Sequence, residues 1–87
     1  MATGLTIYST PWCGYCARAK GLLEEKGAAY NEMDVMEDET KRAEMRARSK
    51  RSTVPQIFIN GQHIGGSDEL AELERDGKLD ALLAQPG

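Results

Sequence analysis

The sequence contains few of the residue types that build metal centres, and it lacks any long apolar run. Its 87 residues include two cysteines and one histidine, whereas a structural zinc site uses four Cys or His ligands. No apolar segment approaches the roughly 18 residues that a membrane span needs. The net charge of −3 argues against a general affinity for nucleic acids or anionic membranes. We therefore expect a globular chain that works without a bound metal.

The N-terminal segment also lacks the features of a secretion signal. Residues 1–4 carry no basic side chain, and no long apolar stretch follows them, so we expect no signal peptide. Two cysteines in an otherwise cysteine-poor chain suit the cytoplasm, where thiols stay reduced. At this length we expect one small domain that spans residues 1–87.

Both cysteines lie in one motif, Cys13-Gly14-Tyr15-Cys16, just before a helical pattern. At a helix start, the first thiol lies where free N–H groups and the helix dipole favour an anion, which lowers its pKa. The second thiol is near enough to attack a disulfide that the first one forms. The motif predicts reversible thiol–disulfide exchange, with Cys13 and Cys16 as the catalytic pair.

Two other interpretations of this motif remain open. A structural disulfide between Cys13 and Cys16 would close a loop of about four residues, which the chain-entropy model values at roughly 2 kcal/mol. A zinc site would need two more ligands, and His63 is far away in sequence. The redox interpretation is favoured over both.

The chain alternates between strand and helix patterns and then forms a hairpin. Strands are expected at 5–8, 29–35, 56–59 and 62–64, and helices at 14–26, 37–49, 67–77 and 79–83. Asn60-Gly61 between the last two strands is a strong hairpin signal. The order β-α-β-α-β-β-α predicts an α/β fold, a mixed four-stranded sheet flanked by helices. A CxxC motif beside such a pattern is typical of a thioredoxin fold.

Within the segment 37–49 we expect an apolar stripe through Met36, Ala43 and Ala47 to face the core. Met33, Met36 and Met45 are expected to fill the core. Three i,i+4 charge pairs are expected to support this helix: Glu37–Lys41, Asp38–Arg42 and Glu44–Arg48. Trp12 is expected to form a half-exposed lip over the cysteines. His63 is expected on the surface, without a partner.

The tripeptide Thr53-Val54-Pro55 precedes the hairpin. A residue before proline is pushed toward an extended conformation, which predicts a rigid turn into the strand. The alternative that we favour is a cis-proline beside the cysteines. It would leave the Val54 backbone groups free to pair with an extended thiol substrate.

Two charged features could bind the ends of a small zwitterionic ligand. In Gly65-Gly66-Ser67-Asp68, Ser67 could cap the next helix, or the helix start could bind an anion while Asp68 accepts from an ammonium group. The basic cluster Arg46, Arg48, Lys50 and Arg51 is either a solvated helix end or, through Arg51, a contact for a small carboxylate.

Together, these motifs resemble the glutaredoxins, in particular the short bacterial dithiol type. The likeness runs nearly end to end, through Ile7-Tyr8, Cys13 to Lys20, Arg51 to Ile59, His63 to Gly66 and Gly77 to Asp80. The resemblance implies a thioredoxin fold and a monomeric oxidoreductase with glutathione as co-substrate. Its partners would be disulfide-containing or glutathionylated proteins.

The resemblance also assigns roles to individual residues. Cys13 would be the nucleophile and Cys16 the resolving thiol, with no metal in the enzyme form. The positions that match glutathione contacts are Tyr15, Arg51, Thr53, Val54, Pro55, Ser67 and Asp68.

Three positions depart from the family pattern. The usual CPYC motif is CGYC here, and Thr10 replaces a lysine often found three residues before the first cysteine. Glu69 stands where a second aspartate is common.

Two alternative functions follow from these residues. Trp12-Cys13-Gly14 is similar to thioredoxin, which suggests a redoxin fed by thioredoxin reductase. The glycine in CGYC suggests a [2Fe–2S] homodimer, an iron–sulfur carrier or sensor in which Cys13 and glutathione would be the ligands.

Overall fold

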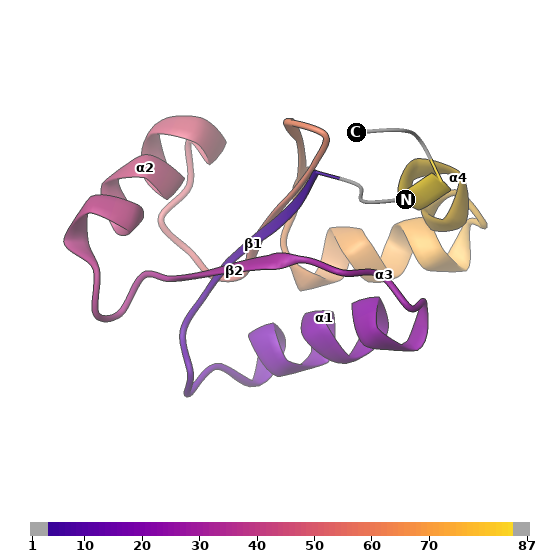
Figure 1. The fold of residues 1–87 in the computed structure, drawn as a ribbon, viewed down its shortest axis with the longest axis horizontal. Coiled ribbons are helices and arrows are strands. Elements are labelled where there is room, and N and C mark those ends of the chain that lie inside the picture. The colour runs from indigo at the N-terminus through magenta and orange to yellow at the C-terminus, as the bar shows by residue number, and fades with distance from the viewer. Residues whose placement is uncertain (1–3, 85–87) are drawn as a thin grey trace.

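The computed structural model describes residues 4–84, which form four strands and four helices (Figure 1). The elements in chain order are β1 (Leu5–Ser9), α1 (Gly14–Glu25), β2 (Asn31–Asp34), α2 (Glu39–Ser49), β3 (Gln56–Ile59), β4 (Gln62–Gly65), α3 (Ser67–Arg75) and α4 (Leu79–Ala84). None of the helices in this range has the length and apolar character to cross a membrane.

The strands form one mixed sheet in the order β2-β1-β3-β4. β1 pairs in parallel with β2, which requires a crossover connection, and α1 supplies it. β1 also pairs antiparallel with β3, and β3 pairs antiparallel with β4 through the hairpin. Asn60 and Gly61 both have positive φ, 53° and 81°, as a two-residue hairpin turn requires. The predicted mixed four-stranded sheet flanked by helices is confirmed.

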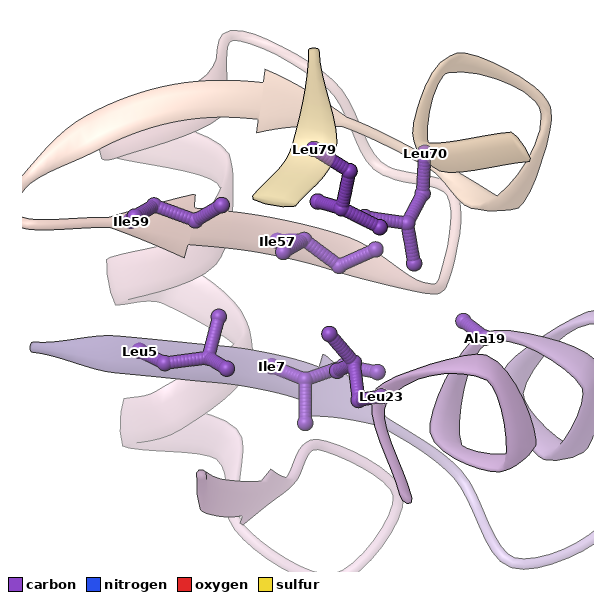
Figure 2. Packing of buried hydrophobic residues seen from close by; sticks show 8 residues of the cluster. All are labelled: Leu5, Ile7, Ala19, Leu23, Ile57, Ile59, Leu70 and Leu79. Carbon is purple, nitrogen blue, oxygen red and sulfur yellow. The ribbon is translucent and has the colours of Figure 1, made fainter. Parts of the chain in front are cut away.

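Alternation along β1 and β3 divides the core between the two faces of the sheet. Ile7 and Ile57 point toward α1 and α3, where the larger cluster also contains Leu5, Ala19, Leu23, Ile59, Leu70 and Leu79 (Figure 2). Tyr8 and Phe58 point to the other face, where they pack with Val35 and Met45 under α2. Figure 1 shows α2 apart from the other three helices, as this division requires. The cysteine motif lies at the start of α1, the helix that contributes Ala19 and Leu23 to the larger cluster.

We expect Leu70→Ala to lower the free energy of unfolding by about 2–5 kcal/mol, because Leu70 is fully buried in the larger cluster. Met36→Ala is the control, since 47% of that side chain is exposed, and its loss should be clearly smaller. Urea denaturation measures both variants. Equal losses would contradict the assignment of the core.

The apolar stripe predicted for the second helix is wrong. Met36, Ala43 and Ala47 are all exposed. The side chains that α2 buries are Met45, as expected, and Ser49. The helix begins only at Glu39, because its N-cap residue is extended and accepts hydrogen bonds from the first-turn amides. Ser49 is satisfied on the buried face because its hydroxyl donates to the Met45 carbonyl at 2.7 Å.

The three predicted i,i+4 ion pairs also fail. Within residues 4–84, none of them lies at ion-pair distance. Asp38 is the N-cap residue, and its carboxylate accepts from the amides of Thr40 and Lys41. Glu44 and Arg48 both bind the hydroxyl of the buried Tyr8 instead of each other. Tertiary partners have replaced the local ones.

Candidate active site

Cys13 is the N-cap residue of α1. Its backbone is extended (φ −97°, ψ 118°), and its Sγ accepts a hydrogen bond from the Cys16 amide at 3.3 Å. A sulfur in this position faces the unsatisfied N–H groups of a 12-residue helix. Both cysteines are free thiols; Cys13 is partly exposed and Cys16 is buried. Only Cys13 is therefore open to a substrate.

The two thiols have opposite pKa shifts. Burial acts to raise the pKa of Cys13, but hydrogen bonds from Cys16 and Tyr15 and the charge of Lys20 lower it below the ordinary 9.0. Burial raises the pKa of Cys16 to about 11; a hydrogen bond from the Thr10 amide opposes this rise, and the neighbouring Cys13 adds to it. Cys13 is thus the thiol that ionises first, and Cys16 keeps its proton.

Lys20 supplies the positive charge near the thiols that the missing family lysine would otherwise provide. This role was not predicted from the sequence. Thr10 occupies the lysine position and is buried. Lys20 lies one helical turn after Cys16, and its charge lowers the pKa of both thiols. Glu32 on β2 holds Lys20 at 2.8 Å and also accepts from the Ser9 hydroxyl at 2.9 Å. The i,i+4 spacing from Cys16 could have indicated this residue.

An open pocket of about 200 Å³ lies beside the thiols. All seven residues that the family resemblance assigned to glutathione line it, together with Gln56, Gly66 and Glu69. Val54 joins the pocket to the redox pair, because the Cys13 thiol donates to its carbonyl oxygen at 3.9 Å. The Val54–Pro55 peptide bond is cis, as the sequence analysis favoured. The structure thus brings together residues from three separate sequence motifs.

The far wall of the pocket is the turn between β4 and α3. The N-cap of α3 is Gly66 and not Ser67, because the Glu69 side chain reaches back to accept from the Gly66 amide at 2.6 Å. The same Glu69 oxygen accepts from Arg51 at 3.3 Å. Gly65 has φ +124°, and a Cβ there would lie 2.6 Å from that oxygen. Glu69 therefore connects the two walls of the pocket, a role that the sequence analysis missed.

The basic cluster does not act as one unit. Arg51 lines the pocket, whereas Arg48 lies over the Phe58 ring at 4.2 Å and donates to the Tyr8 hydroxyl. Lys50 ends α2 in the left-handed conformation. Arg51 alone of these residues is placed to meet a ligand in the pocket.

Of the aromatic residues around the cysteines, Trp12 is more exposed than predicted. Trp12 is 83% exposed and so is no half-buried lip, because the turn before α1 directs it to solvent. Tyr15 is 59% exposed and lines the pocket, with the Arg18 guanidinium 5.6 Å from its ring centre. His63 is not a free surface residue: its Nε2 lies 2.7 Å from Gln56 Oε1.

An exposed thiol of lowered pKa with a buried partner, carried on this sheet, is the arrangement of a thiol–disulfide oxidoreductase. Comparison with known proteins narrows the class. The glutaredoxin family model matches residues 5–64, and this chain belongs to the glutaredoxin family. Its two closely spaced cysteines fit the dithiol type.

Several similar proteins align with nearly the whole chain. It is 49% identical over 80 residues to glutaredoxin of Pseudomonas aeruginosa, which covers 92% of this chain and 95% of that relative. It is 52% identical over 77 residues to glutaredoxin 3 of Escherichia coli, covering 88% and 93% of the two chains. The crystal structure of a buckwheat glutaredoxin–glutathione complex aligns with TM-score 0.86 at 37% identity, covering 93% of this chain and 76% of that one. The predicted thioredoxin fold is confirmed.

These findings do not favour the iron–sulfur alternative. The matches identify the chain as a dithiol oxidoreductase of the glutaredoxin family.

Proposed function

We propose that this glutaredoxin takes its electrons from glutathione and reduces protein disulfides and glutathione mixed disulfides in the cytoplasm. The observation that carries the proposal is the pocket, in which the seven glutathione-type positions converge beside Cys13. The solved glutathione complex of the buckwheat relative supports the same ligand.

The chemistry for a glutathionylated protein needs only the exposed thiol. The Cys13 thiolate attacks the glutathione sulfur of the mixed disulfide, and the target protein leaves as a thiolate that takes a proton from water. A second glutathione thiolate then attacks the glutathione sulfur bound to Cys13. Oxidised glutathione leaves, and Cys13 returns as the thiolate. One glutathione thiol is oxidised for each mixed disulfide reduced, because the other half of the oxidised glutathione comes from the substrate.

A protein disulfide needs both thiols. Cys13 attacks one sulfur of the substrate and forms a mixed disulfide with it. Cys16 then loses its proton and attacks Cys13 Sγ, which releases the reduced substrate and leaves a Cys13–Cys16 disulfide. Two glutathione molecules reduce that disulfide in turn. The high pKa of Cys16, about 11, keeps it protonated while Cys13 attacks the substrate.

The pocket offers complementary partners for both ends of glutathione. Asp68 is exposed on the wall of the pocket and can accept from the ammonium of the γ-glutamyl end, while the α3 amides face the adjacent carboxylate. Arg51 can bind the glycine carboxylate. Within residues 4–84, no hydrogen bond engages the Val54 amide, so it is available to pair with the peptide backbone of the ligand.

We expect Asp68→Ala to raise the KM for glutathione by roughly five- to tenfold, the effect of losing a charge-assisted contact worth about 1–1.5 kcal/mol. Asp76→Ala is the matched control at the other end of α3, and it should leave the KM unchanged. Steady-state assays coupled to glutathione reductase measure both. Indifference to Asp68→Ala, with equal turnover from thioredoxin reductase, would favour the redoxin alternative.

A further inference from the structure

Gln56 is a fully buried polar side chain in the wall of the pocket. Its Nε2 donates to the Thr53 carbonyl oxygen at 3.0 Å and lies 3.1 Å from Thr53 Oγ1. On its other side, Oε1 lies 2.7 Å from His63 Nε2. A buried amide with partners on both sides ties the hairpin residue His63 to the Thr53 turn.

The chemistry of these partners fixes the direction of every hydrogen bond in the line. The Thr53 carbonyl can only accept, so the Gln56 nitrogen must face Thr53 and its oxygen must face His63. That oxygen also only accepts, so His63 carries a proton on Nε2. Burial, and then the charge of Arg51, lower the pKa of His63, which favours the neutral form with Nε2–H.

The direction of these hydrogen bonds determines what Thr53 can offer a ligand. Thr53 is exposed and lines the pocket. The Gln56 nitrogen donates to a lone pair of Thr53 Oγ1. Within residues 4–84, the Thr53 hydroxyl accepts this hydrogen bond and donates none. Its proton is therefore available to a ligand.

We propose that Gln56 and His63 are positioning residues, which hold the Thr53 hydroxyl as a hydrogen-bond donor to a carbonyl or carboxylate oxygen of the thiol substrate. The inference rests on the glutathione site proposed above. Neither residue is hydrogen-bonded to Cys13 or Cys16, so we expect their effect to be on binding of the substrate through Thr53 and not on the sulfur chemistry.

The first test separates binding from turnover. Gln56→Met keeps the length of the side chain and removes its polar atoms. It should raise the KM for glutathione roughly threefold to tenfold and leave kcat within about twofold. The control is Gln62→Met, the same change at an exposed residue of the hairpin, which should alter neither constant. An unchanged KM in folded Gln56→Met would overturn the inference.

A double-mutant cycle tests whether Gln56 acts through Thr53. If it does, Gln56→Met should add nothing to the rise in KM already caused by Thr53→Val, because that variant lacks the hydroxyl. Additive effects would contradict the inference. If Thr53→Val by itself leaves the KM unchanged, the hydroxyl makes no contact with the ligand and the inference is overturned, whereas the proposed function is tested separately by Asp68→Ala.

The hairpin end supplies a test that does not depend on the stability of the Gln56 variant. His63→Leu removes the donor to Gln56 and should raise the KM, whereas His63→Gln offers an amide donor and should restore it. Nitrogen NMR of the His63 ring should show the Nε2–H tautomer in the wild type. Equal KM values for the two His63 variants, or the Nδ1–H tautomer, would reject the line His63–Gln56–Thr53.

Discussion

Cys13→Ser is expected to abolish reduction of a glutathione mixed disulfide. Cys13 is the partly exposed thiol at the start of α1, and its pKa is lowered by hydrogen bonds and by the charge of Lys20 against the opposing effect of burial. A serine hydroxyl does not ionise near neutral pH and cannot form the disulfide intermediate. Turnover should fall to the background rate of glutathione alone, measured in the assay coupled to glutathione reductase.

The matched control is Cys16→Ser, the same substitution three residues later. A second glutathione can still resolve the Cys13–glutathione disulfide, so reduction of small mixed disulfides should survive. Reduction of protein disulfides that require the second thiol should fall sharply. Residual activity near the wild-type level in Cys13→Ser would overturn the assignment of the nucleophile.

Alkylation is expected to be strongly selective for Cys13 near neutral pH. The pKa of Cys13 lies below 9.0 and that of Cys16 is about 11, so Cys13 has at least roughly 100 times the thiolate fraction. Its lower basicity reduces the intrinsic reactivity of the thiolate by about tenfold. The net effect is that Cys13 should react about tenfold or more faster than Cys16. The complete burial of Cys16 increases this difference further.

The two pKa shifts also predict how the labelling rate of each cysteine depends on pH. Labelling of Cys13 should rise with pH up to its pKa, below 9.0, and then level, whereas labelling of Cys16 should keep rising toward pH 11. Mass spectrometry of iodoacetamide-treated reduced protein, with Cys13→Ser as the reference for Cys16, measures both rates. Parallel pH profiles for the two thiols would contradict the opposite pKa shifts.

The comparison of sequence and structure is most instructive in α2. The sequence pattern placed Ala43, Ala47 and Met45 on the core side, but of these the fold buries only Met45, and it buries Ser49 as well. Helical periodicity does not say which side of a charged helix will meet the sheet when its apolar residues are few. The direction was decided by Tyr8, whose hydroxyl binds Glu44 and Arg48 from β1, a contact across 36 and 40 residues of sequence.

By itself, the sequence determined the redox pair, the hairpin and the order of the elements. CxxC before a helical pattern, and Asn60-Gly61 between strand-like runs, are local signals whose physical causes act within a few residues. The resemblance to glutaredoxins supplied the candidate ligand positions for the same reason, since each lies in a short motif.

The tertiary structure alone decided what those motifs meet. It brought Lys20 and Glu32 together beside the thiols, connected Arg51 to Gly66 through Glu69, and gave His63 a buried partner in Gln56. It also separated the pKa values of two cysteines that are alike in sequence, because burial differs between a helix cap and the first turn behind it. Such contacts depend on how strands and helices pack, which no local pattern specifies.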